Sequence, residues 1–372
     1  MPTSSGPNQT AEENLVFAYD VGDVKNSYIG EPTENLVADA LTMANWGNYS
    51  AGNDGTFITE FNTTGYKVRG KNTWNGILKG ITLPTPGTYT ISAWFRIWGK
   101  SSGNNGINVY TNGGGISDTA QGGDDTRIGE WQRISMTRTY TTTSITFFII
   151  SWGGTSGVDW SSWDVTKPQV ELNSHATQFI EGPRSTTEGL IDLTGNSSID
   201  LANVSFDSNA QMVFDGTNDY VDLGSDSTIS PINQGWTAEY VFKTNSAGTL
   251  QHFNSAEADD FNANWLALLS SKLAVWDHGQ GTWRYGDTVF SSNTWYHIAF
   301  IQESGTSMQF YVNGEPEGGD HTTFNWSPNY SALKTRYIGR YEYNGGYGRY
   351  FNGEMPVAKL YNKALTAQEV KQ

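Results

Sequence analysis

The feature that most limits how this chain can fold is a two-residue alternation of apolar and polar side chains in many short segments. In residues 87–98, GTYTISAWFRIW, the alternate positions from Tyr89 to Ile97 are apolar. Successive strand residues point to opposite faces, so this pattern predicts a strand with one buried face. Residues 144–152, SITFFIISW, are apolar on both faces, which predicts a central strand. The other face of the first segment carries Thr90, Ser92, Trp94, Arg96 and Trp98.

Helical periodicity is almost absent from the sequence. The one candidate helix is the C-terminal tail, where Thr366 and Glu369 have the spacing of a capping box. Elsewhere, short strand-like segments alternate with turn signals such as Asn313-Gly314. We therefore predict an all-β fold of two antiparallel β-sandwiches (jelly rolls), for which 372 residues are sufficient.

Charge and composition exclude several classes of function. The 22 Lys and Arg residues against 38 Asp and Glu residues give a formal charge of −16, the wrong sign for nucleic acid or anionic lipid. The absence of cysteine excludes disulfides, thiolate zinc sites and cysteine nucleophiles. We also expect no membrane span and no signal peptide, because no segment has the required apolar length and residues 1–14 lack a basic start.

Three motifs follow one another in the second half of the chain: MVFDGTNDYVDLG at 212–224, NTWYHIAFIQESGTSMQFYVNGE at 293–315 and RYFNGEMPVAKLYNKALTAQEV at 349–370. Together they resemble a concanavalin A-like lectin/laminin-G-type sandwich over residues 186–372. In many phage and bacterial members of that family, a first strand similar to residues 14–23, NLVFAYDVGD, comes shortly before a stretch similar to residues 189–200, GLIDLTGNSSID.

Here those two segments are far apart, so the resemblance implies that a second module is inserted in a loop of the sandwich. The alternative is that residues 14–31 simply begin the first domain. The predicted organisation is an N-terminal arm (1–13), the first strand of the lectin-like sandwich (14–33), an inserted module (34–182) and the lectin-like sandwich (183–372).

The inserted module carries PGTYTISAWFR at 86–96, GEWQRISMTRTY at 129–140 and WDVTKPQVELNSHATQFIEG at 163–182. These segments resemble, more loosely, the jelly-roll carbohydrate-binding modules of phage structural proteins. The resemblance implies a sugar-binding type of sandwich and a virion setting.

Aromatic residues in loops are candidates for ligand contact, because binding residues concentrate on loops over a rigid scaffold. Their rings could stack on the C–H faces of a glycan or, alternatively, form a contact with another protein. The strand residues Trp94, Trp236 and Trp295 are instead expected to pack as core or edge cover. The candidate ligand-binding residues are Trp152, Trp160, Trp163, Trp276, Trp283, Tyr285, Tyr343 and Tyr347.

Calcium is the metal that the resemblance implies, since relatives of both modules often bind it. Asp215 and Asp219 in FDGTNDY could present carboxylate oxygens from one turn, and Asp164 is a candidate in the inserted module. Asp124 and Asp125 are further candidates there. The alternative for each is turn formation without a metal.

No catalytic residues are expected. A retaining glycosidase needs two carboxylates about 5 Å apart, and no strand carries the alternating pattern that would supply them. The nearest acidic cluster, Glu257, Asp259 and Asp260, lies in a polar stretch typical of a loop, and the histidines lack metal-binding spacing.

With the two resemblances, these features indicate a non-enzymatic phage virion surface protein: a capsid decoration or fibre protein, or a tail-associated adhesin. It would present glycan-binding β-sandwiches for assembly and host-surface attachment. The expected partners are other virion proteins, a host-surface glycan and further copies of the chain in a trimer. The alternatives are a secreted bacterial carbohydrate-binding or adhesion protein, which needs an export signal, and a glycoside hydrolase, which needs a carboxylate pair.

Overall fold

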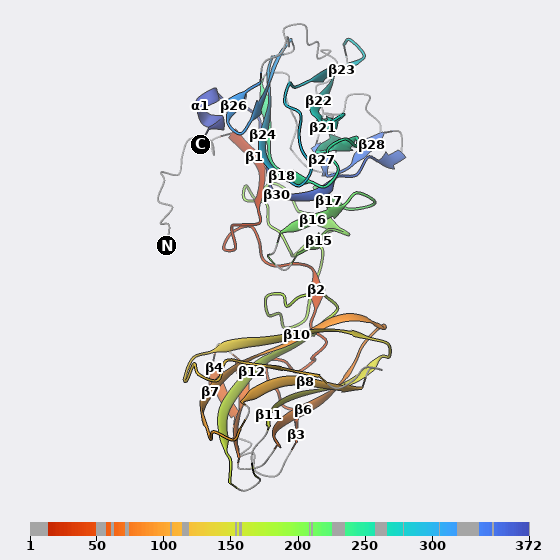
Figure 1. Cartoon of the computed structure of the whole chain (residues 1–372). Coiled ribbons are helices and arrows are strands. Elements are labelled where there is room, and N and C mark those ends of the chain that lie inside the picture. The colour runs from red at the N-terminus through yellow and green to blue at the C-terminus, as the bar shows by residue number, and fades with distance from the viewer. Residues whose placement is uncertain are drawn as a thin grey trace. The chain divides into compact units, whose positions relative to one another are not determined.

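The protein forms two compact units (Figure 1). The composite unit combines the described residues up to Pro32 with those from Ser185 onward, and the middle unit is Thr33–Arg184. The predicted arm, residues 1–13, lies outside the described residues. The computed structural model describes residues 14–49, 57–60, 63–70, 74–104, 106–113, 119–152, 155, 158–207, 209, 211–224, 235–256, 266–277, 279–304, 306–317, 335–343 and 346–371.

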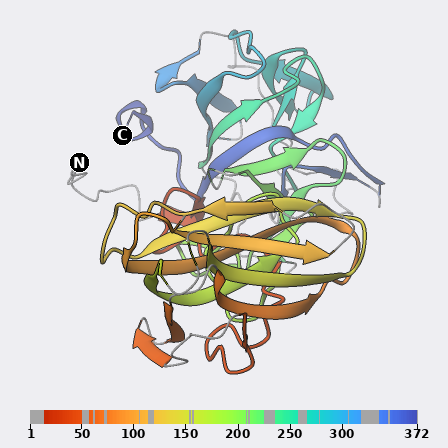
Figure 2. The ribbon, with the colours of Figure 1, turned by 60° about the horizontal axis from the view of Figure 1, so that its bottom comes forward.

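The middle unit contains two antiparallel sheets of five strands (Figure 2). The first has the order β10 (Gln132–Tyr140), β7 (Gly87–Lys100), β12 (Ser161–Glu171), β5 (Thr63–Gly70) and β4 (Phe57–Glu60). The second has the order β3 (Gly47–Asn48), β6 (Trp74–Thr82), β11 (Ser144–Trp152), β8 (Ile107–Gly113) and β9 (Thr119–Gly122). Strand β11 is the segment predicted to be central, and it lies in the middle of its sheet.

The alternation of β7 is confirmed by burial. Its apolar face contributes Tyr89, Ile91, Ala93, Phe95 and Ile97 to the core of the middle unit. Burying a side chain the size of isoleucine or phenylalanine stabilises a fold by about 1.5–3 kcal/mol, which fixes the register of the strand. The opposite face of β7 is therefore left for other contacts.

The two ends of the middle unit lie side by side. Strand β2 (Thr33–Glu34) pairs antiparallel with β13 (Pro183–Arg184), with Glu34 opposite Pro183. The chain thus enters and leaves this unit at neighbouring backbone positions, as an inserted domain requires.

The composite unit is also built of antiparallel strands. Its largest sheet has the order β15 (Ser205–Phe206), β16 (Met212–Asp215), β30 (Asn352–Tyr361), β18 (Trp236–Thr244), β24 (Trp295–Ser304), β25 (Ser307–Val312) and β26 (Glu315–Pro316), and β1 (Leu15–Asp20) also pairs with β30. A second sheet has the order β14 (Asp200–Ala202), β17 (Tyr220–Asp222), β27 (Thr335–Ile338) and β20 (Asn254–Ala256). A third has the order β19 (Gln251–His252), β21 (Leu266–Leu269), β22 (Lys272–Asp277) and β23 (Thr282–Tyr285). One core joins the three sheets, and Phe242, Ile338 and Leu268 represent them in it. The all-β prediction is confirmed.

The opening strand belongs to the composite unit. Phe17 and Tyr19 of β1 are fully buried in its core, and the Tyr19 hydroxyl donates to the Met355 carbonyl at 3.1 Å. The backbone N–H of Leu193 donates to the Ala18 carbonyl, so the segment 189–200 meets β1 again. This arrangement is the one that an insertion would produce, and the insertion itself stays a prediction.

Two local predictions are also confirmed. Thr366 and Glu369 form a reciprocal capping box at the start of the short helix α1 (Ala367–Val370). Asn313 and Gly314 have φ angles of 51° and 81° and join β25 to β26 in a two-residue hairpin. No helix in the described part of the chain is long and apolar enough to cross a membrane.

Candidate functional site

One face of the third sheet of the composite unit is aromatic. Register places His252 opposite Ala267, Ala267 opposite Ala274, and Ala274 opposite Tyr285, so the four share one face. We call His252, Trp276, Trp283, Tyr285 and Tyr341 the aromatic face. The other face of the sheet supplies Leu266, Leu268, Leu273 and Val275 to the core.

The centre of the aromatic face is a tryptophan pair. Trp276 and Trp283 are direct partners across β22 and β23, and their ring centroids lie 5.4 Å apart at 74°. Both rings are half-buried, and Tyr285, two residues further along β23, is 41% exposed. The structure therefore brings together the predicted residues Trp276, Trp283 and Tyr285.

His252 forms the buried floor of this face. Its ring centroid lies 6.2 Å from that of Trp283 and 5.0 Å from that of Tyr341, of strand β28 (Tyr341–Tyr343). Burial, and then the nearby charge of Arg349, lower the pKa of His252 to about 3, so the imidazole is neutral at pH 7. Neither ring nitrogen has a hydrogen-bond partner among the described residues.

Arg349 lies at the margin of the aromatic face. Its guanidinium carbon is 4.4 Å from the ring centroid of Tyr341, and its carbonyl accepts the backbone N–H of His252 at 3.0 Å. The sequence alone assigns no role to His252 or to Arg349. Their proximity depends on strands that are distant in sequence, so no local pattern signals it.

The predicted tyrosines of the segment 341–350 do not join this face as a group. Tyr347, of strand β29 (Gly346–Gly348), is exposed, and its ring centroid lies 4.3 Å from the guanidinium carbon of Arg340. Arg340 is buried, stacks on Tyr337 and pairs with Glu342 at 2.8 Å. Tyr347 thus belongs to a separate arginine-centred cluster. The side chain of Tyr343 lies outside the described residues.

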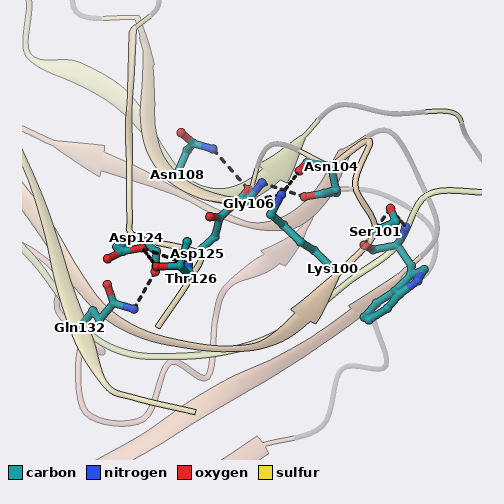
Figure 3. A network of polar contacts seen from close by, with 10 residues as sticks. Lys100, Ser101, Asn104, Gly106, Asn108, Asp124, Asp125, Thr126 and Gln132 are labelled. Atoms are coloured by element: carbon teal, nitrogen blue, oxygen red, sulfur yellow. Dashed lines mark hydrogen bonds and ion pairs between the residues drawn. The ribbon is translucent and has the colours of Figure 1, made fainter. Parts of the chain in front are cut away.

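The predicted aromatic site of the middle unit needs a correction. Trp163 is fully buried in the core, so its indole cannot meet a ligand from solvent. The alternation of β12 places it on the inner face, which a reading of the segment as a loop overlooked. Trp160 is partly exposed, and its backbone is tied to Ser101, shown in Figure 3. The side chain of Trp152 lies outside the described residues.

The three tryptophans predicted to be structural differ in their surroundings. Trp236 is buried in the core, as predicted. Trp295 is 43% exposed at the start of β24, with the Lys243 ammonium 5.1 Å from its ring centroid. Trp94 is half-buried on the outer face of β7. The alternation of side chains along a strand thus predicts the burial of a tryptophan better than the residue type does.

The aspartates proposed for calcium in the composite unit have the contacts of a turn. Asp215 Oδ1 accepts the backbone N–H groups of Thr217 and Asn218 at 2.7 and 3.2 Å. Asp219 Oδ2 accepts the backbone N–H of Asp215 at 2.8 Å. Burial raises the pKa of Asp219 to about 6 against the effect of this hydrogen bond, and the charge of Asp215 raises it further. Turn formation without a metal accounts for these contacts.

Asp164 does not fit a calcium site. Its two carboxylate oxygens pair with Arg69 at 3.1 Å and Arg96 at 3.0 Å, and cationic groups occupy the positions a metal ion would take. Among the described side chains, no group of three or more His, Asp and Glu residues could hold a metal ion.

The acidic pair of the middle unit is used within its loops (Figure 3). Asp124 Oδ1 accepts the Thr126 backbone N–H at 3.0 Å and its hydroxyl at 2.6 Å. Asp125 pairs with Lys100 at 3.0 Å. Calcium binding stays a prediction for this protein. Heat on calorimetric titration with millimolar calcium would support it, and the absence of heat would remove it.

The acidic cluster considered for catalysis, Glu257, Asp259 and Asp260, lies outside the described residues. Within the aromatic face, none of the five side chains is a carboxylate, and the one titratable base, His252, is buried and neutral. The face offers stacking surfaces rather than acid–base groups.

Comparison with known proteins gives a family match for the C-terminal part of the chain. Residues 215–371 match the model of the concanavalin A-like lectin/glucanases superfamily. This segment, which holds the whole aromatic face, is similar to that superfamily. No curated protein matches the chain significantly.

Solved structures similar to parts of the chain include a neurotoxin domain, a carbohydrate-binding module and a sialidase. The receptor binding domain of botulinum neurotoxin C/D mosaic serotype is 13% identical, with 50% of this chain and 48% of that chain covered and a TM-score of 0.38. The CBM40 of a Ruminococcus gnavus IT-sialidase, bound to alpha2,3 sialyllactose, is 13% identical, with 46% and 95% covered and a TM-score of 0.36. A Trypanosoma rangeli sialidase mutant displaying trans-sialidase activity is 15% identical, with 49% and 30% covered and a TM-score of 0.36. The chain spans about half the length of the neurotoxin chain it matches.

Proposed function

We propose that this protein binds a glycan through the aromatic face of its lectin-like domain and does not cleave it. The observation that carries the proposal is the Trp276–Trp283 pair, with rings 5.4 Å apart beside the exposed Tyr285. The faces of such rings can stack on sugar C–H groups at low entropic cost, because strand pairing already fixes the backbone beneath them.

The floor of the site supports this arrangement. Ala267 and Ala274 are small, so the large rings around them stand above the sheet. The neutral His252 packs beneath Trp283 and Tyr341 without bringing a charge under the stacking surface. Arg349, exposed at the margin, supplies hydrogen-bond donors for hydroxyl groups.

A glycan array tests the proposal directly. The wild-type chain should bind a defined set of glycans, and Trp283→Ala should lose about tenfold or more in affinity, because an aromatic contact and its buried area are removed. Trp295→Ala is the control, because Trp295 is an exposed strand tryptophan of the same unit outside the aromatic face.

Unchanged glycan binding by Trp283→Ala, together with lost self-assembly, would assign the aromatic face to protein contact instead. That result would remove the lectin proposal.

The setting we propose is the surface of a phage virion, as a capsid decoration or fibre protein or a tail-associated adhesin. The support is the resemblance of its motifs to those of virion proteins. There it would contact other virion proteins and a host-surface glycan, and it would assemble as a trimer. Mass spectrometry of purified particles should detect the chain, and light scattering of the pure protein should give three times 40.9 kDa. A monomer in solution, or absence from particles, would contradict these proposals.

A glycoside hydrolase is the alternative that one observation favours, since the matching superfamily also contains glucanases. A hydrolase would shorten the glycans that it binds. Product analysis by chromatography separates the two functions.

A further inference from the structure

The outer face of the first sheet of the middle unit carries an arginine between two indole rings. The guanidinium carbon of Arg96 lies 4.5 Å from the ring centroid of Trp98 and 4.6 Å from that of Trp131. The Trp98 indole N–H donates to Asp164 Oδ2 at 2.7 Å, so both the position and the orientation of this ring are fixed. Trp98 nevertheless remains 45% exposed.

Further basic groups lie on the same face of the sheet as this exposed indole. The buried Asp164 carboxylate is shared by Arg69 and Arg96, so the trio keeps one net positive charge. Lys67 is the direct partner of Asp164 across β5 and β12, which places its side chain on the same face. Lys67 forms no ion pair with any described residue. We call Lys67, Arg69, Arg96, Trp98 and Asp164 the basic indole face.

The net charge of the basic indole face is positive, opposite in sign to the net charge of the whole chain. The protein has a formal charge of −16, which repels anions in general. A local excess of positive charge beside a fixed, open indole therefore selects for a ligand that combines an anionic group with a stacking surface. A neutral sugar would use the indole alone, and a simple anion would use the charges alone.

We propose that the basic indole face binds an acidic saccharide. Its sugar ring would stack on Trp98, and its carboxylate or sulfate group would lie toward Lys67 and Arg69. This site does not depend on glycan binding at the aromatic face, and sequence reasoning did not assign a ligand to any of its members except Asp164, as a metal ligand.

The test uses the full chain and calorimetry with three probes: trigalacturonic acid, a sulfated trisaccharide and neutral galactotriose. We expect an acidic probe to bind about tenfold or more tightly than the neutral one, because charge-assisted hydrogen bonds form only with the anion. Raising the sodium chloride concentration to about 0.5 M should weaken binding of the acidic probe several-fold, because salt screens the basic groups. The carboxylated and sulfated probes distinguish the two sources of negative charge, and binding of either supports the site.

Two variants locate the binding. Trp98→Ala should lower the affinity for the acidic probe about tenfold by removing the stacking surface. Lys67→Gln should lower the same affinity about threefold or more and leave binding of the neutral probe unchanged. Trp295→Ala is the control, because it removes a tryptophan of similar exposure that also has a cationic side chain over its ring, here Lys243, outside this site. Circular dichroism checks that each variant is folded.

Three results would overturn the proposal: no binding of either acidic probe at millimolar concentration, equal affinity for acidic and neutral probes, or full affinity in folded Trp98→Ala. Loss of acidic-probe binding in Trp283→Ala but not in Trp98→Ala would also overturn it, and would move that binding to the aromatic face.

Discussion

The indole N–H of Trp98 donates to the carboxylate of Asp164 at 2.7 Å, and this carboxylate also forms ion pairs with Arg96 and Arg69. Asp164→Asn leaves two guanidinium groups without their counter-charge in a largely buried position. We expect the free energy of unfolding of the middle unit to fall by about 2–3 kcal/mol, less than for a wholly buried pair because both arginines keep some contact with solvent. Urea unfolding followed by tryptophan fluorescence measures this change.

Asp124→Asn is the matched control for that variant, because Asp124 is an exposed aspartate of the same unit. Its effect should stay within about 0.5 kcal/mol. Equal unfolding midpoints for the two variants would show that the Asp164 network contributes nothing to stability.

The place of β1 in the composite unit leads to a second prediction. Phe17 is fully buried in that core and packs edge-on to Tyr19 with ring centroids 6.0 Å apart. Phe17→Ala should therefore destabilise the composite unit by about 3–5 kcal/mol and leave the middle unit unchanged. Val24→Ala, at an exposed site in the same segment, should have little effect. Limited proteolysis with identification of the fragments reports which unit opens, and opening of the middle unit alone would contradict the assignment of β1.

Close backbone contact at Gly353 gives a third prediction. Its φ angle is 148°, and a Cβ there would lie 2.1 Å from the carbonyl oxygen of Lys243 on the neighbouring strand. Gly353→Ala should separate β30 from β18 and lower the thermal unfolding midpoint of the composite unit by several degrees or more. Gly348→Ala, where a Cβ meets nothing within 4 Å, should leave the midpoint unchanged. A midpoint unaffected by Gly353→Ala would contradict the packing of these strands.

The pH dependence of stability provides a fourth prediction. Burial raises the pKa of Asp219 from 3.8 to about 6 in the folded protein, so the folded state binds this proton more tightly than the unfolded state. Protonation therefore stabilises the fold, and this contribution is lost as pH rises from about 4 to about 6. Relative to the wild type, Asp219→Asn should gain about 3 kcal/mol of stability across that window and then remain constant. The measurement is urea unfolding of both proteins at a series of pH values. A difference that does not change with pH would show that Asp219 titrates normally.

Much of the fold could be predicted from the sequence because strand alternation is a local property. The buried face of β7, the central position of β11 and the hairpin at Asn313-Gly314 each follow from a few consecutive residues. Trp163 shows the limit of reasoning from residue type. Its position two residues before Val165 on β12 predicts burial, while its glycine- and serine-rich surroundings favoured a loop.

The candidate sites could be predicted only in part. Trp276 and Trp283 are close in sequence, so a hairpin brings them together. The contacts of His252 with Tyr341 and of Asp164 with Arg69 join strands that are distant in the chain, and no local pattern encodes them. The alternation of residues in β7 predicts which side chains lie on its outer face. Whether Trp98 can bind a ligand depends on charged residues that β5 and β12 bring to the same face, and these are distant in sequence.

The central claim is that the protein holds a glycan without changing it. The most direct measurement is chromatography of a glycan identified on the array, recovered from the complex after prolonged incubation with the wild-type chain. We predict that the recovered glycan has its original length and that Trp283→Ala retains much less of it. Recovery of shortened fragments, or equal retention by the wild type and the variant, would contradict the claim.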